Sequence, residues 1–121
     1  MKLHHIALGA RKVDLLADFY QKAFDLPELT RHFYDDQRLR SVWLDLGGPI
    51  LMIEDTDAQR PHRDGVDAGP FLLAFTITEE QRPHLEARLL HLGAPIESRT
   101  AYTSYARDPE GNRIAISFYA P

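Results

Sequence analysis

Residues 4–26, HHIALGARKVDLLADFYQKAFDL, pass from a strand pattern into a helix pattern within one segment. The short apolar run before Gly9 predicts a strand over Leu3–Leu8. From Val13 onward, apolar residues recur every three or four positions, which predicts a helix that Asp14 would cap. The expected apolar face of this helix comprises Leu15, Leu16, Phe19, Tyr20, Ala23 and Phe24.

Residues 29–36, LTRHFYDD, predict a strand that runs into a turn at Asp35-Asp36, and two more strands joined by a tight turn are expected after it. In residues 39–46, apolar and polar side chains alternate, so Val42 and Leu44 would face one side of the strand and Trp43 the other. Gly47-Gly48-Pro49 predicts a turn, and residues 50–54, ILMIE, predict the returning strand. The first half of the chain therefore has the order strand, helix, strands closing in a hairpin.

The second half repeats this order. Residues 70–78, PFLLAFTIT, predict a strand, and residues 78–94 predict a helix with Thr78 as its cap. Residues 101–107 and 113–119 predict two strands around the turn at 108–112, DPEGN. We therefore expect a single α+β domain over 1–121 with module 1 at about 1–55, a linker at about 56–69 and module 2 at about 70–121.

Composition restricts the function classes. The chain has 121 residues, no cysteine, and a formal net charge of -4 from 14 basic and 18 acidic residues. The absence of cysteine excludes disulfides and thiolate sites, and the lack of a basic surplus argues against a nucleic-acid partner. No apolar run approaches the roughly 18 residues of a membrane span, and the start lacks a signal-peptide core. We expect no membrane partner and a cytoplasmic location.

The two ends of the chain carry a resemblance to a known superfamily. Residues 4–26 and residues 107–118, RDPEGNRIAISF, resemble the opening and closing signatures of vicinal oxygen chelate proteins, the glyoxalase, bleomycin resistance and extradiol dioxygenase group. The resemblance implies two βαβββ modules that curl into a cup-shaped mixed sheet with helices on the outside. It also implies a homodimer and a small-molecule ligand inside the cup.

Metal-dependent members of that group take one ligand from the first strand and one from the last strand of each module. The resemblance places these four positions at His5, Met52, Leu72 and Ala115, and only the first can bind a metal in the expected way. We therefore expect no cofactor. The alternative is a weakly held divalent ion (Zn, Ni, Mn or Fe), for which Glu54 or a partner subunit would supply further ligands.

The leading hypothesis is thus a metal-independent protein that binds a hydrophobic or aromatic small molecule, like the resistance proteins of the group. Its expected ligand-binding residues are His5, Trp43, Met52, Leu72, Ala74, Tyr105 and Ala115. One alternative is a lyase or isomerase of the glyoxalase type with His5 and Glu54 as catalytic residues. Another is a dimeric interaction module without a small-molecule function. The other histidines, His32, His62, His84 and His91, fall on expected loops or helix surfaces and receive no role.

Overall fold

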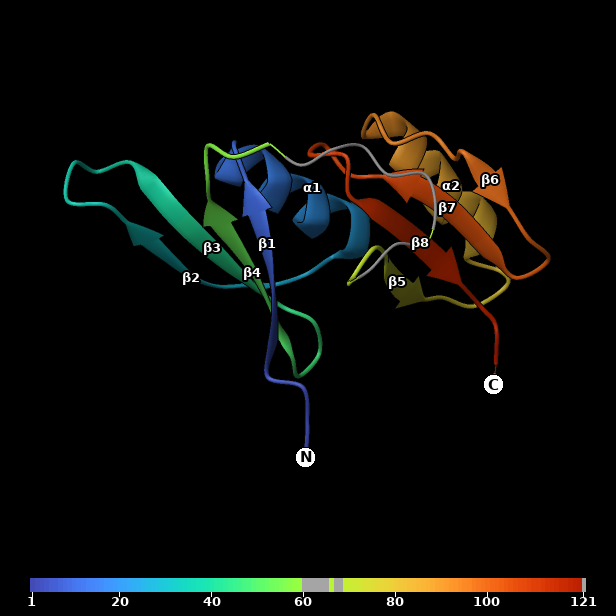
Figure 1. Ribbon diagram of the computed structural model, residues 1–121. Helices are drawn as coiled ribbons and strands as arrows, with labels where there is room; N and C mark the ends of the chain where they lie inside the picture. Colours follow the sequence, from blue (N-terminus) through green and yellow to red (C-terminus); the bar gives the residue numbers. More distant parts are fainter. Residues whose placement is uncertain (60–65, 67–68, 121) are drawn as a thin grey trace. The chain divides into compact units, whose positions relative to one another are not determined.

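The computed structural model describes residues 1–59, 66 and 69–120, and it divides the chain into two units, Met1–Arg60 and Pro61–Pro121 (Figure 1). Each unit has the order strand, helix and three strands, so the expected pair of βαβββ modules is confirmed. Module 1 consists of β1 (His5–Ala10), α1 (Val13–Phe24), β2 (Glu28–Phe33), β3 (Leu39–Asp45) and β4 (Ile50–Asp55). Module 2 consists of β5 (Leu73–Thr76), α2 (Arg82–His91), β6 (Ser98–Arg99), β7 (Thr103–Arg107) and β8 (Arg113–Ser117).

Part of the expected linker, residues 60–65 and 67–68, lies outside the described residues, as does His62. Neither described helix is long and apolar enough to cross a membrane.

The sheet of module 1 has the strand order β1-β4-β3-β2. Its first and last strands pair in parallel, whereas β4 with β3 and β3 with β2 pair antiparallel. In this register Met52 lies between Ala7 of β1 and Trp43 of β3. Side chains alternate across a sheet, so these three residues share one face.

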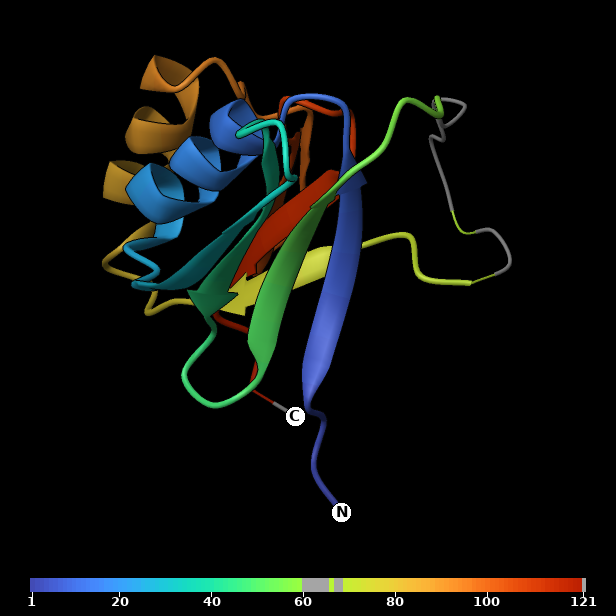
Figure 2. The same cartoon turned by 90° about the vertical axis from the view of Figure 1, so that its left-hand side faces the viewer.

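The opposite face of this sheet carries the core of module 1 and packs against α1 (Figure 2). Val42, Leu44, Leu51 and Ile53 have no exposed surface, and they meet the buried helix residues Val13, Leu16, Ala17, Phe19, Tyr20 and Ala23.

Two expectations for this helix are wrong. Leu15 is 52% exposed because it lies outside the buried stripe. Asp14 lies inside the first turn, since the N-cap is Lys12 and no side chain caps the helix.

Module 2 repeats the same sheet in the order β5-β8-β7-β6. The first and last strands again pair in parallel, and Ala115 lies between Ala74 of β5 and Tyr105 of β7. Ala115 therefore holds the same place in module 2 that Met52 holds in module 1. The strand β6 has only two residues, and a segment this short carries no periodic signal in the sequence.

The second helix differs from the first in how it packs. Leu89 is the only residue of α2 that is buried, and the helix begins at Arg82 rather than near Thr78. Thr78 instead closes a turn with Gln81, whose backbone N–H donates to the threonine Oγ at 3.3 Å while the glutamine Oε1 accepts from the Thr78 N–H at 2.8 Å. The expected acidic residues at the helix start, Glu79 and Glu80, consequently precede the helix.

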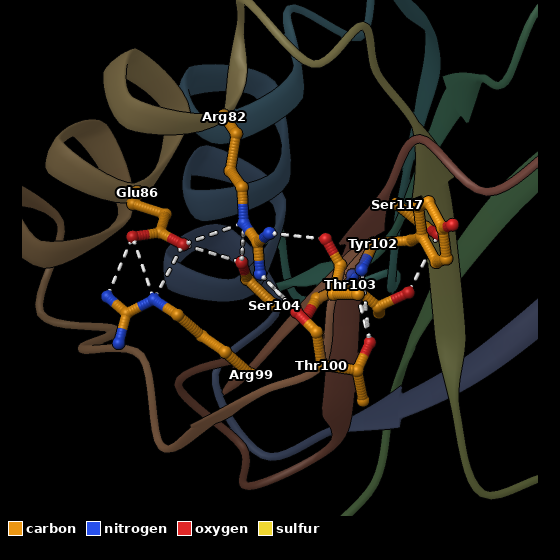
Figure 3. A network of polar contacts seen from close by, with 9 residues as sticks. Arg82, Glu86, Arg99, Thr100, Tyr102, Thr103, Ser104 and Ser117 are labelled. Atoms are coloured by element: carbon orange, nitrogen blue, oxygen red, sulfur yellow. Dashed lines mark hydrogen bonds and ion pairs between the residues drawn. The ribbon is translucent and has the colours of Figure 1, made fainter.

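Polar contacts join α2 to the strands beside it (Figure 3). The Glu86 carboxylate accepts hydrogen bonds from Arg99 at 2.7 Å, from Arg82 at 3.3 Å and from the buried Ser104 hydroxyl at 2.5 Å. Arg82 also donates to the Ser104 Oγ at 2.9 Å and to the backbone carbonyl oxygens of Thr100, Ala101 and Thr103. The Glu86 carboxylate and the Arg82 guanidinium thereby connect α2 to β6, β7 and the turn between them.

This network predicts acid-sensitive stability. Hydrogen bonding from Arg99 and, to a smaller extent, from Ser104 and Arg82 lowers the pKa of Glu86 from its ordinary value of 4.5 to about 2. Because the folded-state pKa is depressed, Glu86 stabilises the folded chain above pH 4.5, and this contribution is lost as the pH falls towards 2. We expect Glu86→Gln to lower the free energy of unfolding by about 1–2 kcal/mol at pH 7 and by much less near pH 2.5.

Urea denaturation followed by circular dichroism across this pH range measures the difference. Glu79→Gln is the matched control, because Glu79 is exposed just before the same helix, and it should change stability by less than about 0.5 kcal/mol. A Glu86→Gln cost that stayed constant from pH 7 to pH 2.5 would contradict the assignment.

Candidate functional site

Each sheet has one face turned away from the helix of its own module, and we call it the helix-free face. In module 1 it carries His5, Ala7, Gly9, Thr30, His32, Ser41, Trp43, Asp45, Ile50, Met52 and Glu54. The row Ala7–Met52–Trp43 crosses β1, β4 and β3 and is apolar. The next row, Gly9–Glu54–Ser41–His32, is polar and crosses all four strands.

A cluster of three side chains, His32, Ser41 and Trp43, lies at the β2 side of this face. The His32 Nδ1 and the Ser41 Oγ lie 3.0 Å apart, and the Ser41 side chain is buried, with 1% of its surface exposed. The His32 ring also contacts the Trp43 indole, with ring centroids 4.7 Å apart. From the sequence, His32 is expected on a loop or helix surface and receives no role. This placement is wrong, because the structure places His32 on β2 opposite Ser41, in a register that a bulge shifts on either side.

The structure does not bring His5 and Glu54 together. His5 is the β1 partner of Ile50, whereas Glu54 is the partner of Gly9, four residues further along the strands. At about 3.3 Å per residue, this separates the two by roughly 13 Å along the sheet, beyond hydrogen-bond reach. The imidazole of His5 instead lies beside its exposed neighbour His4, with their Nδ1 atoms 2.8 Å apart.

The helix-free face of module 2 has a floor of small side chains. Ala74 and Ala115 lie side by side in the β5–β8 register, and Tyr105 follows on β7. Leu72 precedes β5 by one residue, so alternation places it on the same face as Ala74. The Arg113 guanidinium lies 4.8 Å from the centre of the Tyr105 ring. The hydroxyl groups of Thr103 and Ser117 form a hydrogen bond of 2.8 Å.

The predicted ligand-binding residues therefore divide into two groups. His5, Trp43 and Met52 lie on the helix-free face of module 1, and Leu72, Ala74, Tyr105 and Ala115 lie on that of module 2. Tyr102 lies before β7 and is half exposed, and its ring contacts those of Phe118 and Tyr119.

The repeated strand order and the paired signatures at the chain ends agree with a sequence-family match. A model of the Glyoxalase/Bleomycin resistance protein/Dioxygenase superfamily matches residues 2–116. The chain belongs to this superfamily. No curated protein matches it significantly by sequence.

Solved structures of the superfamily share the fold. A mutant of the fosfomycin resistance protein FosX from Listeria monocytogenes, complexed with Mn(II) and 1S,2S-dihydroxypropylphosphonic acid, gives a TM-score of 0.82 at 19% identity over 98% of this chain and 93% of its own. A glyoxalase/dioxygenase from Nostoc punctiforme gives 0.77 at 22% identity, covering 95% and 88%. Lactoylglutathione lyase from Agrobacterium tumefaciens gives 0.68 at 21% identity, covering 96% and 92%. At identities of 19–22%, these similarities show a shared fold alone.

The residues at the expected ligand positions are a poor fit for a divalent ion such as the Mn(II) of the FosX complex. Of the four positions that the resemblance assigns to metal ligands, His5 offers an imidazole, Met52 a soft thioether, and Leu72 and Ala115 no donor atom. Among the described residues, no group of three or more histidine, aspartate or glutamate side chains converges in a way that could hold a metal. The residues present therefore do not fit a resident metal.

Proposed function

We propose that this chain is a metal-independent small-molecule-binding member of the superfamily, which holds a hydrophobic or aromatic ligand against its helix-free sheet faces. The observation that carries the proposal is the chemistry of the equivalent central positions of the two sheets. Met52 and Ala115 occupy matching places between the first and third strands of their sheets. An apolar side chain at both places suits an apolar ligand rather than an ion.

The neighbours of these two positions support an aromatic ligand. In module 1, Met52 adjoins Ala7 and Trp43, which gives a flexible thioether, a small floor residue and a large aromatic platform in one row. In module 2, Ala115 adjoins Ala74 and the ring of Tyr105. A small residue beside one aromatic ring on each face suits a flat molecule that stacks on the ring.

The register gives less support to a lyase or isomerase that uses His5 and Glu54 as a pair. Because the two side chains lie roughly 13 Å apart along the sheet, neither can orient the other by a hydrogen bond. The side chain that His5 does contact is its neighbour His4, so Glu54 does not orient His5 as a general base.

The proposal includes a homodimer. Within the described residues, β1 and β5 each form one edge of their own sheet, and an edge strand presents unpaired backbone groups. A second copy of the chain is the simplest cover for such edges in this superfamily. We expect light scattering at micromolar concentration to give twice the chain mass of 13.8 kDa, whereas a monomer mass would contradict this part of the proposal.

Ligand binding predicts a change in the emission of Trp43, the only tryptophan of the chain. We expect at least one member of a panel of planar aromatic compounds to alter this emission with a saturable dependence on concentration. Met52→Glu should weaken that binding by about tenfold or more, because it places a charge beside the platform. Glu79→Gln, which leaves the Ala7–Met52–Trp43 row intact, should leave it unchanged. No saturable change across the panel up to millimolar concentrations would contradict the proposal.

A further inference from the structure

The cluster of His32, Ser41 and Trp43 contains a polar group without a partner. The indole Nε1–H of Trp43 is buried, and none of the described residues accepts a hydrogen bond from it. Burying an N–H without an acceptor is unfavourable, so such groups are rare in folded proteins and require an explanation. Any molecule that brings an acceptor to this nitrogen would recover part of that cost.

A second donor stands on the same face. Ser41 precedes Trp43 by two residues on β3, so both side chains project from the helix-free face. The Ser41 Oγ already contacts the His32 Nδ1 at 3.0 Å. When the imidazole carries its proton on Nδ1, it donates to the Oγ and leaves the serine O–H to donate elsewhere. His32 can thus set Ser41 as a donor on the same sheet face as the indole N–H.

We propose that Trp43, Ser41 and His32 form a polar subsite that receives a neutral carbonyl oxygen of a planar aromatic ligand. The inference rests on the proposed function, since the aromatic part of the ligand would lie on the adjoining Ala7–Met52–Trp43 row. The two donors would bind the oxygen while the apolar row contacts the ring.

The charge beside the subsite favours a ligand that carries a ketone or amide over one that carries a carboxylate. Glu54 is the cross-strand partner of Ser41 in the β3–β4 register, and it is only partly buried. Directly opposed side chains in an antiparallel pair lie about 4.5–5.5 Å apart at Cβ, so an anionic ligand group would meet a carboxylate. A neutral carbonyl accepts the same hydrogen bonds without that repulsion.

The test compares three naphthalene probes of similar size on the uniformly ¹⁵N-labelled full chain. These are 2-acetylnaphthalene with a neutral acceptor, 2-ethylnaphthalene without one, and 2-naphthoate with an anionic one. The single indole of Trp43 gives one side-chain cross-peak in a proton–nitrogen correlation spectrum. We expect 2-acetylnaphthalene to bind about threefold to tenfold tighter than 2-ethylnaphthalene and to move the indole proton downfield. The naphthoate should bind no tighter than the ketone.

Variants at Ser41 and His32 distinguish binding to the polar subsite from binding to the apolar Ala7–Met52–Trp43 row. Ser41→Ala and His32→Phe should each reduce the preference for the ketone by roughly threefold and leave 2-ethylnaphthalene binding unchanged, because both keep the apolar row. Ser117→Ala is the matched control, since it removes a hydroxyl from the helix-free face of module 2, and it should preserve the preference.

The outcomes distinguish this inference from the proposed function. If both neutral probes bind equally and the indole proton does not move, the subsite is wrong while the aromatic platform stands. If the preference survives both Ser41→Ala and His32→Phe, the inference is equally overturned. If no probe shifts any resonance of the chain up to millimolar concentration, the proposed function fails and the inference fails with it.

Discussion

The parallel pairing of the first and last strands in each module is the constraint on which the rest of the structure depends. It places Ala7 beside Met52 in module 1 and Ala74 beside Ala115 in module 2. Since side chains alternate, a shift of one residue would exchange the helix-packed and helix-free faces along a whole strand. The core residues Leu51 and Ile53 leave no room for such a shift, because they have no exposed surface against α1. The core thus determines which side chains a ligand can meet.

The two modules stabilise the same topology by different means. Module 1 buries an apolar stripe of α1, whereas α2 buries only Leu89 and is joined to its strands by Arg82 and Glu86. A polar attachment of this kind depends on the ionisation of one carboxylate, while an apolar stripe does not. The expected consequence is that acid loosens the second helix before it affects the first.

Much of the fold could be predicted from the sequence because its signals are local. The period of two in residues 39–46, the helical period after Val13 and the turn at 108–112 each indicate one element, and their repetition indicates two modules. The helix starts were less predictable, since Asp14 and Thr78 are good caps by type but the chain begins its helices elsewhere. Met52 and Ala115 were singled out by the family resemblance, and alternation along their strands then indicates which neighbours share a face with them.

The contacts that depend on register or on tertiary packing were not predictable. His32 meets Ser41 only because a bulged β2 pairs with β3 in one particular register, and no spacing in the sequence reports that. The distance between His5 and Glu54 likewise follows from the parallel register of β1 with β4. The network of Glu86 and Arg82 joins residues up to 22 positions apart, so it too becomes visible only in three dimensions.

The most direct test of the central claim is the metal content of the wild-type chain, purified without a polyhistidine tag. Elemental mass spectrometry measures bound ions, and calorimetry then measures the binding of Mn(II), Fe(II), Co(II), Ni(II) and Zn(II). The account predicts far less than one ion per chain and no saturable heat at millimolar concentrations. One tightly bound ion per chain would contradict it, because ligands other than His5 would then have to converge on the helix-free faces.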